Sequence, residues 1–229
     1  MALFTLVAPS ILAIDYNNTE VLDDALEDME KAGANFVHLD VMDGKFVEHK
    51  TFDERLVDYV QNKTTLMLDV HLMVENPEKE VDKYIEAGAD VLTFHYEASK
   101  DPEKLLKYIK SKNVLAGIAI SPSTPALKIK DLLNKNIVDV VTVMGVEPGA
   151  GGQSFIPGSA EKVAEVREMD RSVYIEIDGG VSLKNSKILR KLGANILVSG
   201  SYIFGSKNMR KAINGLKGRA WLAHINSLF

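Results

Sequence analysis

Eight short apolar runs, separated by longer amphipathic segments, constrain the fold of this chain more than any other feature. The runs have the length and the Val, Ile and Leu content of buried strands. They cover residues 6–12, 36–42, 66–73, 91–96, 114–120, 138–144, 173–178 and 196–200. Segment 19–32 illustrates the intervening helix pattern, with Thr19 as the expected N-cap and Gly33 as the expected C-terminal stop. Regular alternation of strands and helices predicts parallel pairing through right-handed crossovers.

The length of the chain favours one architecture over another. Its 229 residues are 46% hydrophobic, enough for one sizeable core, and eight strand–helix units in this length predict a (β/α)8 TIM barrel. A doubly wound open sheet is the alternative, but it normally carries an early GxGxxG motif, and SILAIDYNN after the first run has no glycine. We find no linker or low-complexity segment, so we expect a single domain over 1–229, with 208–229 forming the last barrel helix and a tail.

Composition excludes several classes of protein. The formal net charge of −5 argues against a nucleic-acid or membrane-surface protein. Neither a signal peptide nor a membrane helix is expected, because the N-terminal apolar stretch lacks a basic region and no apolar run approaches about 20 residues. The absence of cysteine excludes disulfides, thiolate metal sites and cysteine nucleophiles, and it fits a cytoplasmic location.

Polar residues fall at the ends of the expected strands, where barrel enzymes carry their chemistry. They are Ser10, His38, Asp40, His71, His95 and Asp178. Two carboxylates in one barrel mouth are costly unless a cation neutralises them, so His38, Asp40, His71 and Asp178 together predict a divalent metal site. Nitrogen and oxygen donors without sulfur suit Zn, Fe(II), Mn or Co. A lone buried histidine is more often a core residue than a metal ligand. Two roles stay open for His95: it could contact and support a metal ligand, or it could simply line the site.

Glycine-rich loops follow the last three runs, where barrels commonly bind phosphate through backbone N–H groups. They are VEPGAGGQSF (146–155), IDGGVS (177–182) and VSGSYIFGS (198–206). A tight turn explains each loop taken alone, and Ser182 is expected to cap the next helix. Because these loops contain no lysine, any anion there is expected to be held by backbone dipoles. Met42, Met73 and Met144 near strand ends are ordinary core filling on composition alone, but around the quartet they would form a water-poor floor.

These segments resemble, in order and spacing, the signature segments of the ribulose-phosphate 3-epimerases. The resemblance runs from about Val7 to Gly205 and rests on SILAID, HLDVMDG, DVHLMVENP, FHYEA, SPSTP, VMGVEPGAGGQSF, IDGGV and SGSYIFG. It implies a ribulose-phosphate-binding (β/α)8 barrel, an isomerase of the pentose phosphate pathway, one divalent metal ion and a homo-oligomer. The implied reaction inverts C3 of D-ribulose 5-phosphate to give D-xylulose 5-phosphate through a metal-stabilised enediolate.

The resemblance also implies roles for particular residues. Asp40 and Asp178 would be the acid/base pair, and with His38 and His71 they would hold the metal. The substrate would be bound by Ser10, His71, Met42, Met73 and Met144, with its phosphate held by Gly149, Ala150, Gly151, Gly152, Gly179, Gly180, Gly200 and Ser201. The alternatives are a C3 epimerase of a hexulose 6-phosphate such as D-allulose 6-phosphate, and a non-catalytic phosphosugar-binding barrel. Related decarboxylases and aldolases would need a lysine at a strand end, and the strand ends here are poor in lysine.

The chain departs from the family pattern beside the expected mouth. After DVMDG it reads KFVEHKTFD, which makes Lys45, Glu48, His49 and Asp53 unusual, and Ala150 stands where an aromatic residue is common. Harmless loop drift and a reshaped pocket for a different phosphoketose are both open. None of these positions belongs to the expected metal ligands.

Overall fold

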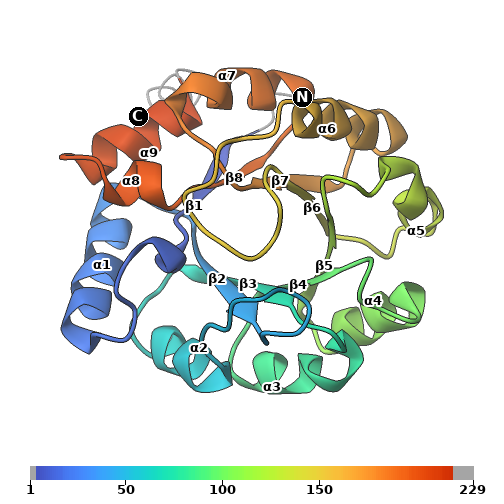
Figure 1. Ribbon diagram of the computed structural model, residues 1–229, viewed down its shortest axis with the longest axis horizontal. Helices are drawn as coiled ribbons and strands as arrows, with labels where there is room; N and C mark the ends of the chain where they lie inside the picture. The colour runs from blue at the N-terminus through green and yellow to red at the C-terminus, as the bar shows by residue number, and fades with distance from the viewer. Residues whose placement is uncertain (1–3, 219–229) are drawn as a thin grey trace.

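The computed structural model describes residues 4–218, in which eight parallel strands form a ring surrounded by helices (Figure 1). The strands pair in the order β1-β8-β7-β6-β5-β4-β3-β2. They are β1 (Leu6–Ala8), β2 (Phe36–Met42), β3 (Met67–Met73), β4 (Val91–His95), β5 (Leu115–Ile120), β6 (Val140–Met144), β7 (Tyr174–Asp178) and β8 (Ile196–Val198). This arrangement confirms the predicted (β/α)8 barrel.

Helices follow the strands and cover the outside of the ring (Figure 1). They are α1 (Thr19–Ala32), α2 (Glu54–Gln61), α3 (Val81–Glu86), α4 (Pro102–Ser111), α5 (Lys130–Asn134), α6 (Gly158–Met169), α7 (Leu183–Leu192), α8 (Ser201–Phe204) and α9 (Met209–Lys217), with 3₁₀ turns η1 (Ile11–Ala13), η2 (Pro77–Lys79) and η3 (Ala126–Ile129). Each longer helix turns an apolar face to the sheet, as α1 does with Leu22, Leu26 and Met29. No helix in 4–218 is both long and apolar enough to cross a membrane.

The helix ends follow local side-chain chemistry. The N-cap of α1 is Asn18 and not the predicted Thr19, because the Asn18 side chain accepts the N–H groups of Glu20 and Val21. Gly33 ends α1 as predicted, with a φ of 81° that favours glycine. Ser182 caps α7 as predicted and forms a capping box with Asn185.

The first strand is shorter than the predicted run 6–12. It ends at Ala8 because Pro9 has no N–H to donate and Ser10 instead caps η1, where its hydroxyl accepts from the Leu12 N–H. The ring therefore closes between β1 and β2 through few contacts. Backbone bonds join Asn35 N–H to the Val7 carbonyl and His38 N–H to the Pro9 carbonyl, each at 3.0 Å.

The last helix begins near the predicted position. Asn208 caps α9, which ends at Lys217. Residues 219–229 of the segment predicted as last helix and tail lie outside the described residues, as do residues 1–3.

Side chains that point into the ring become polar toward the carboxyl ends of the strands. Alternation places His38 and Asp40 of β2 on the inner face, and the register sets Asp40 opposite His71 of β3. Across the ring, Asp178 ends β7 beside Met144. The fold thus delivers both carboxylates and both imidazoles to one end of the barrel interior.

Candidate active site

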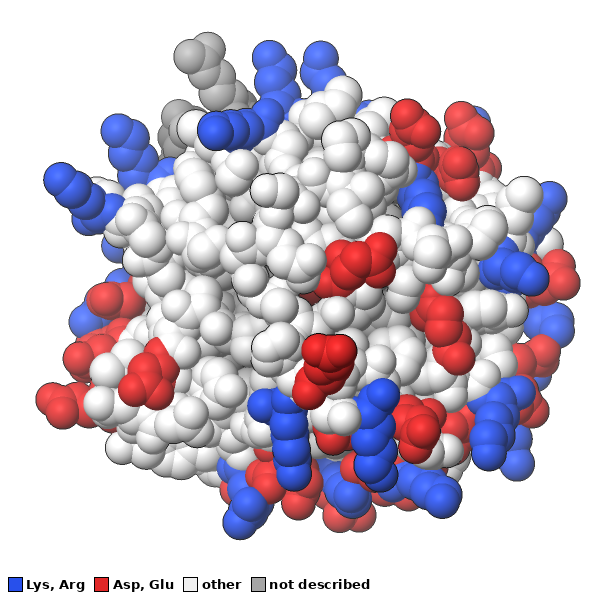
Figure 2. Space-filling view, in the orientation of Figure 1, with Lys and Arg blue, Asp and Glu red and all other residues white. Residues whose placement is uncertain are grey.

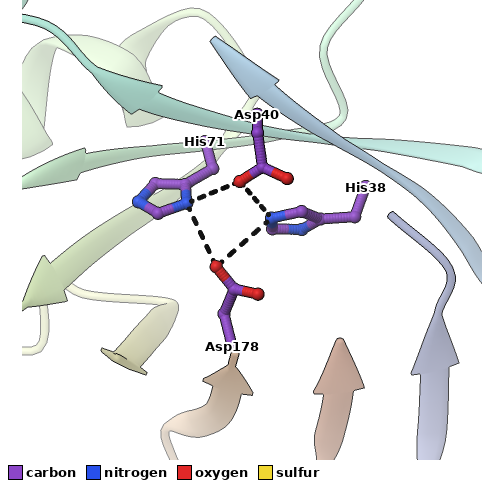
Figure 3. Close-up of side chains that lie close together, drawn as sticks. All are labelled: His38, Asp40, His71 and Asp178. Atoms are coloured by element: carbon purple, nitrogen blue, oxygen red, sulfur yellow. Dashed lines mark ion pairs between the residues drawn. The ribbon is translucent and has the colours of Figure 1, made fainter. Parts of the chain in front are cut away.

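Two imidazoles and two carboxylates meet at the carboxyl end of the barrel (Figure 3). The carboxylate oxygen Oδ1 of Asp40 lies 3.3 Å from Nε2 of His38 and 3.4 Å from Nδ1 of His71. Oδ2 of Asp178 approaches the same two nitrogens from β7, at 3.8 Å and 3.6 Å. All four residues are buried, so the structure brings the predicted quartet together.

The quartet fits a metal ion because its facing nitrogens are otherwise unused. Nε2 of His38 and Nδ1 of His71 are buried and have no hydrogen-bond partner among the described residues. Separations of 3.3–3.8 Å are those of four donors placed about 2.1 Å from one central ion. The buried cluster can therefore bind a divalent metal through two nitrogens and two oxygens.

The buried carboxylates of the site favour positive charge on the groups around them. Burial disfavours a charge on His38, but the carboxylates of Asp40 and Asp69 outweigh that effect and raise the pKa of His38 well above its usual value. Burial likewise favours a neutral Asp40, yet the two imidazoles hold the pKa of its carboxyl below the usual range. The carboxylates thus draw positive charge into this space.

Each quartet histidine has a partner for its other nitrogen. Nδ1 of His38 lies 2.7 Å from a buried carboxylate oxygen of Asp69. Nε2 of His71 lies 3.0 Å from Nε2 of His95, whose Nδ1 in turn lies 3.2 Å from Oε2 of Glu97. Two roles were left open for His95, and the structure favours support of a ligand over simple lining. His95 lies behind His71 and contacts it directly.

A cavity of about 410 Å³ opens directly above the carboxylates. Asp40 and Asp178 lie in its wall, whereas His38 and His71 are fully buried beneath it. The predicted substrate residues that line it are Ser10, Met42, Met73, Met144, Gly149, Ala150, Gly151, Gly152, Gly179, Gly180, Gly200 and Ser201. Ser10 donates its hydroxyl to Oδ2 of Asp40 at 2.7 Å, which fixes that carboxylate.

The glycine loops pack closely against one another at the rim. At Gly180 φ is +65°, and a Cβ there would lie 2.6 Å from the backbone nitrogen of Phe155. A Cβ at Gly179 would lie 2.4 Å from a methyl of Val146. The paired glycines are therefore required by loop packing, which also leaves their backbone open to the cavity.

Charge on this face of the molecule lies mainly at its margin. Figure 2 shows Lys and Arg at the periphery and a largely uncharged middle with a few acidic side chains. The glycine loops supply no lysine, but Lys50, in the loop after β2, lines the cavity. Sequence reasoning singled out Lys45 and His49 in that loop and missed Lys50.

Most of this chain matches a known protein family. Residues 6–204 match the model of the ribulose-phosphate 3 epimerase family. The ribulose-phosphate 3-epimerase of Bacillus subtilis is 39% identical over 217 residues, which cover 93% of this chain and 98% of that protein. The chloroplastic ribulose-5-phosphate-3-epimerase of Arabidopsis thaliana is also 39% identical, over 93% of this chain and 76% of that protein. This chain belongs to the ribulose-phosphate 3-epimerase family.

The fold of this chain is also similar to that of solved structures of other proteins. The crystal structure of KGPDC from Streptococcus mutans superposes with a TM-score of 0.71 at 14% sequence identity, covering 93% of this chain and 96% of that one. At this identity the likeness shows the shared fold alone.

The positions that depart from the family pattern lie at one edge of the site. Lys45, Glu48 and His49 are exposed and line a second cavity of about 600 Å³ between the loops after β2 and β6. His49 and Ala150 border both cavities. Asp53 lies elsewhere, as the N-cap of α2. Four of the five departures thus line the second cavity, beside the first one, and none belongs to the quartet.

Three acidic residues near the quartet, Asp69, Glu176 and Glu97, were not singled out from the sequence. Asp69 precedes His71 by two positions, and Glu176 precedes Asp178 by two, so each pair shares the inner face of its strand. That spacing is the signal that would have found them. Glu97 follows His95 by two positions, but it lies in the turn after β4, where strand alternation no longer predicts the direction of a side chain.

Proposed function

We propose that this chain is a metal-dependent epimerase that interconverts D-ribulose 5-phosphate and D-xylulose 5-phosphate. The observation that supports this proposal is the position of Asp40 and Asp178. They enter from β2 and β7, on different sides of the ring, and line one cavity above two unpartnered imidazole nitrogens. Inversion at C3 by proton transfer needs one acid/base group on each face of that carbon, a role these two carboxylates can fill, and family membership agrees with this chemistry.

His38, Asp40, His71 and Asp178 would hold the ion. A bound divalent ion supplies Lewis-acid stabilisation of the negative charge that develops on the substrate oxygens when C3 loses its proton. Zn, Fe(II), Mn and Co all suit two imidazoles and two carboxylates. These role assignments agree with the two buried nitrogens that lack other partners.

The two carboxylates would act as base and acid on opposite faces of the substrate. One of Asp40 and Asp178 removes the C3 proton from its own face, and the other returns a proton to the opposite face, with the roles exchanged in the reverse direction. The hydroxyl of Ser10 orients Asp40 for this transfer. The buried side chains of Met42, Met73 and Met144 exclude water from the planar enediolate between the two steps.

The phosphate would lie against the glycine loops at the far side of the cavity. Backbone N–H groups around Gly149–Gly152, Gly179–Gly180 and Gly200–Ser201 would donate to its oxygens. We also propose that residues 1–229 form one domain, that the enzyme is a homo-oligomer, and that it acts in the cytoplasm, a location consistent with the absence of cysteine.

Parallel steady-state kinetics test the substrate. We expect kcat/KM for D-ribulose 5-phosphate to exceed that for D-allulose 6-phosphate by at least about tenfold. The hexulose phosphate is the second candidate because the small Ala150 borders both cavities and leaves room beside the entrance. A higher kcat/KM for the hexulose would overturn the pentulose assignment, and binding without turnover of either sugar would indicate a phosphosugar-binding protein.

A further inference from the structure

His95, the last residue of β4, stands directly behind His71. Their Nε2 atoms are 3.0 Å apart, and the two rings stack at 22° with centroids 5.0 Å apart. His95 is fully buried, and the ring of Phe46 covers it with centroids at 4.7 Å. Since Nδ1 of His71 faces Asp40 and Asp178, its remaining nitrogen has its hydrogen bond with His95.

The other nitrogen of His95 faces a carboxylate that is anchored in a turn. Oε2 of Glu97 lies 3.2 Å from Nδ1 of His95, and its side chain is 26% exposed. Its second oxygen accepts the Ser121 N–H at 2.9 Å and the Thr124 hydroxyl. Glu97 is thus held by the turn after β5 and presents one oxygen to the histidine.

A lysine clamps that turn from the neighbouring helix. Lys162 of α6 donates to the carbonyls of Ser121, Pro122 and Thr124 at 2.9, 2.5 and 2.6 Å. Three carbonyl acceptors fix the ammonium, and the ammonium fixes the turn. The position of Glu97 is therefore set by contacts that do not involve the quartet.

The hydrogen bonds from Glu97 to His71 have one consistent direction. An ionised carboxylate only accepts, so Nδ1 of His95 must donate to Glu97. The neutral ring of His95 then has a bare Nε2, which accepts the proton of Nε2 of His71. A His71 ring that carries a single proton is then left with a bare Nδ1 that faces the carboxylates of Asp40 and Asp178.

We propose that His95 and Glu97 are positioning residues that fix the tautomer and ring orientation of His71, so that its bare Nδ1 faces the metal position. The inference rests on the proposed function of the quartet. His38 achieves the same result through one direct contact with Asp69, so the two-residue relay belongs to His71 alone among the quartet histidines. Partners of this kind typically change metal affinity 10- to 100-fold.

The test compares two relay variants with a matched control. Glu97→Gln and His95→Phe remove the carboxylate and the imidazole of the relay. Glu78→Gln is the control, because Glu78 also holds a turn, through Ser99 and Lys100, and it is not part of the relay. Co²⁺ affinity is measured by chelator competition. The His71 tautomer is read in metal-free protein from the ¹⁵N chemical shifts of its ring, at a pH where those shifts show the ring to be neutral. The pH is chosen in this way because burial lowers the pKa of His71 but Asp178 and Asp40 outweigh burial and raise it.

We expect wild type to hold His71 protonated at Nε2, and both relay variants to lose that single tautomer. Co²⁺ affinity should fall about tenfold in Glu97→Gln and up to about 100-fold in His95→Phe, while Glu78→Gln stays within twofold of wild type. Should His95→Phe not fold, Glu97→Gln alone decides, because its site is at the surface.

Two outcomes would overturn the relay. One is an unchanged tautomer together with Co²⁺ affinity within twofold of wild type. The other is an equal loss of affinity in Glu78→Gln, which would make the effect a general consequence of loosening a turn. If wild type itself fails to bind Co²⁺, the metal proposal is wrong, whereas the tautomer measurement on metal-free protein still tests the relay separately.

Discussion

At the scale of single residues, the two proposed acid/base groups have different surroundings. Asp40 is held by the hydroxyl of Ser10 and by two imidazoles, and its side chain is 6% exposed. Asp178 ends its strand, is twice as exposed at 12%, and meets the imidazoles through one oxygen. Asp40 is therefore the more constrained group, and Asp178 can be altered with less disturbance of the barrel interior.

Replacing the carboxylate of Asp178 should stop turnover without unfolding the protein. We expect Asp178→Asn to lower kcat about 10³-fold, since an amide neither removes nor returns the C3 proton. Steady-state kinetics and a thermal melt measure the two effects. Asp90→Asn is the control, because Asp90 binds the Leu68 N–H at the opposite end of the barrel. Near wild-type kcat in Asp178→Asn would rule out the two-carboxylate mechanism.

A methyl group at Gly180 should damage the rim more than one at Gly33. Both glycines have positive φ, but a Cβ at Gly33 meets nothing within 4 Å, whereas one at Gly180 collides with the backbone of Phe155. We expect Gly33→Ala to cost about 1 kcal/mol of unfolding free energy. Gly180→Ala should cost about 2–3 kcal/mol and raise KM severalfold. Urea denaturation and kinetics check both values, and equal effects of the two changes would contradict the packing argument.

At the scale of the elements, strands and helices with strong patterns were predictable and their ends less so. Run 36–42 and segment 19–32 match β2 and α1 residue for residue, because seven buried positions and a clear apolar face leave little freedom. The first run was predicted over 6–12, but β1 ends at Ala8. Hydrophobic periodicity alone does not take into account that Pro9 has no N–H to donate.

The site was predictable where chemistry follows strand alternation and unpredictable where loops supply it. Asp40 and Asp178 were found because polar residues interrupt apolar runs at strand ends. Glu97 lies only two residues after His95, but its anchoring by the Ser121 N–H depends on the path of the turn after β5, which no spacing around His95 encodes. Contacts between loops depend on tertiary packing that a pattern in one segment does not contain.

The turn held by Glu97 should make stability depend on acid pH. Burial would raise the pKa of Glu97, but hydrogen bonds from His95, Thr124 and Ser121 outweigh it and lower the pKa to about 2. A lowered carboxyl pKa stabilises the folded state fully above about 4.5, and the contribution is lost as pH falls from there toward 2.

We therefore expect wild type to exceed Glu97→Gln in unfolding free energy by about 1–2 kcal/mol at pH 6, with a smaller gap at pH 3.5. Urea denaturation at both pH values measures the gap. A difference that stays constant or widens in acid would show that the ionised carboxylate does not stabilise the turn.

At the scale of the whole molecule, the quartet joins opposite walls of the barrel. His38, Asp40 and His71 belong to the neighbouring strands β2 and β3, whereas Asp178 comes from β7 across the ring (Figures 1 and 3). An ion held by all four would cross-link β7 to β2 and β3, with which β7 shares no backbone hydrogen bonds. Metal binding should consequently stabilise the entire fold.

Removing the ion should lower the melting temperature. At a free metal concentration of about 100 Kd, binding adds about 2.7 kcal/mol, which corresponds to about 5–10 °C for a chain of this length. Scanning calorimetry of chelated and reloaded protein, with metal content verified by elemental analysis, measures the shift. His71→Ala should show a much smaller shift, and an equal shift in that variant would mean that the stabilising ion binds elsewhere.

The few contacts between β1 and β2 also affect where the barrel opens by local fluctuation. Two backbone bonds, the bond from the Val7 N–H to the Asn35 side-chain oxygen and the Ser10–Asp40 contact span that gap, and His38 itself donates one of the backbone bonds. Spontaneous opening of the ring should begin at this seam, so the amide proton of His38 should exchange with solvent sooner than its neighbours deeper in the sheet. Activity should then be lost at a lower temperature than the fold, because the first gap to widen borders Asp40, one of the two proposed acid/base groups.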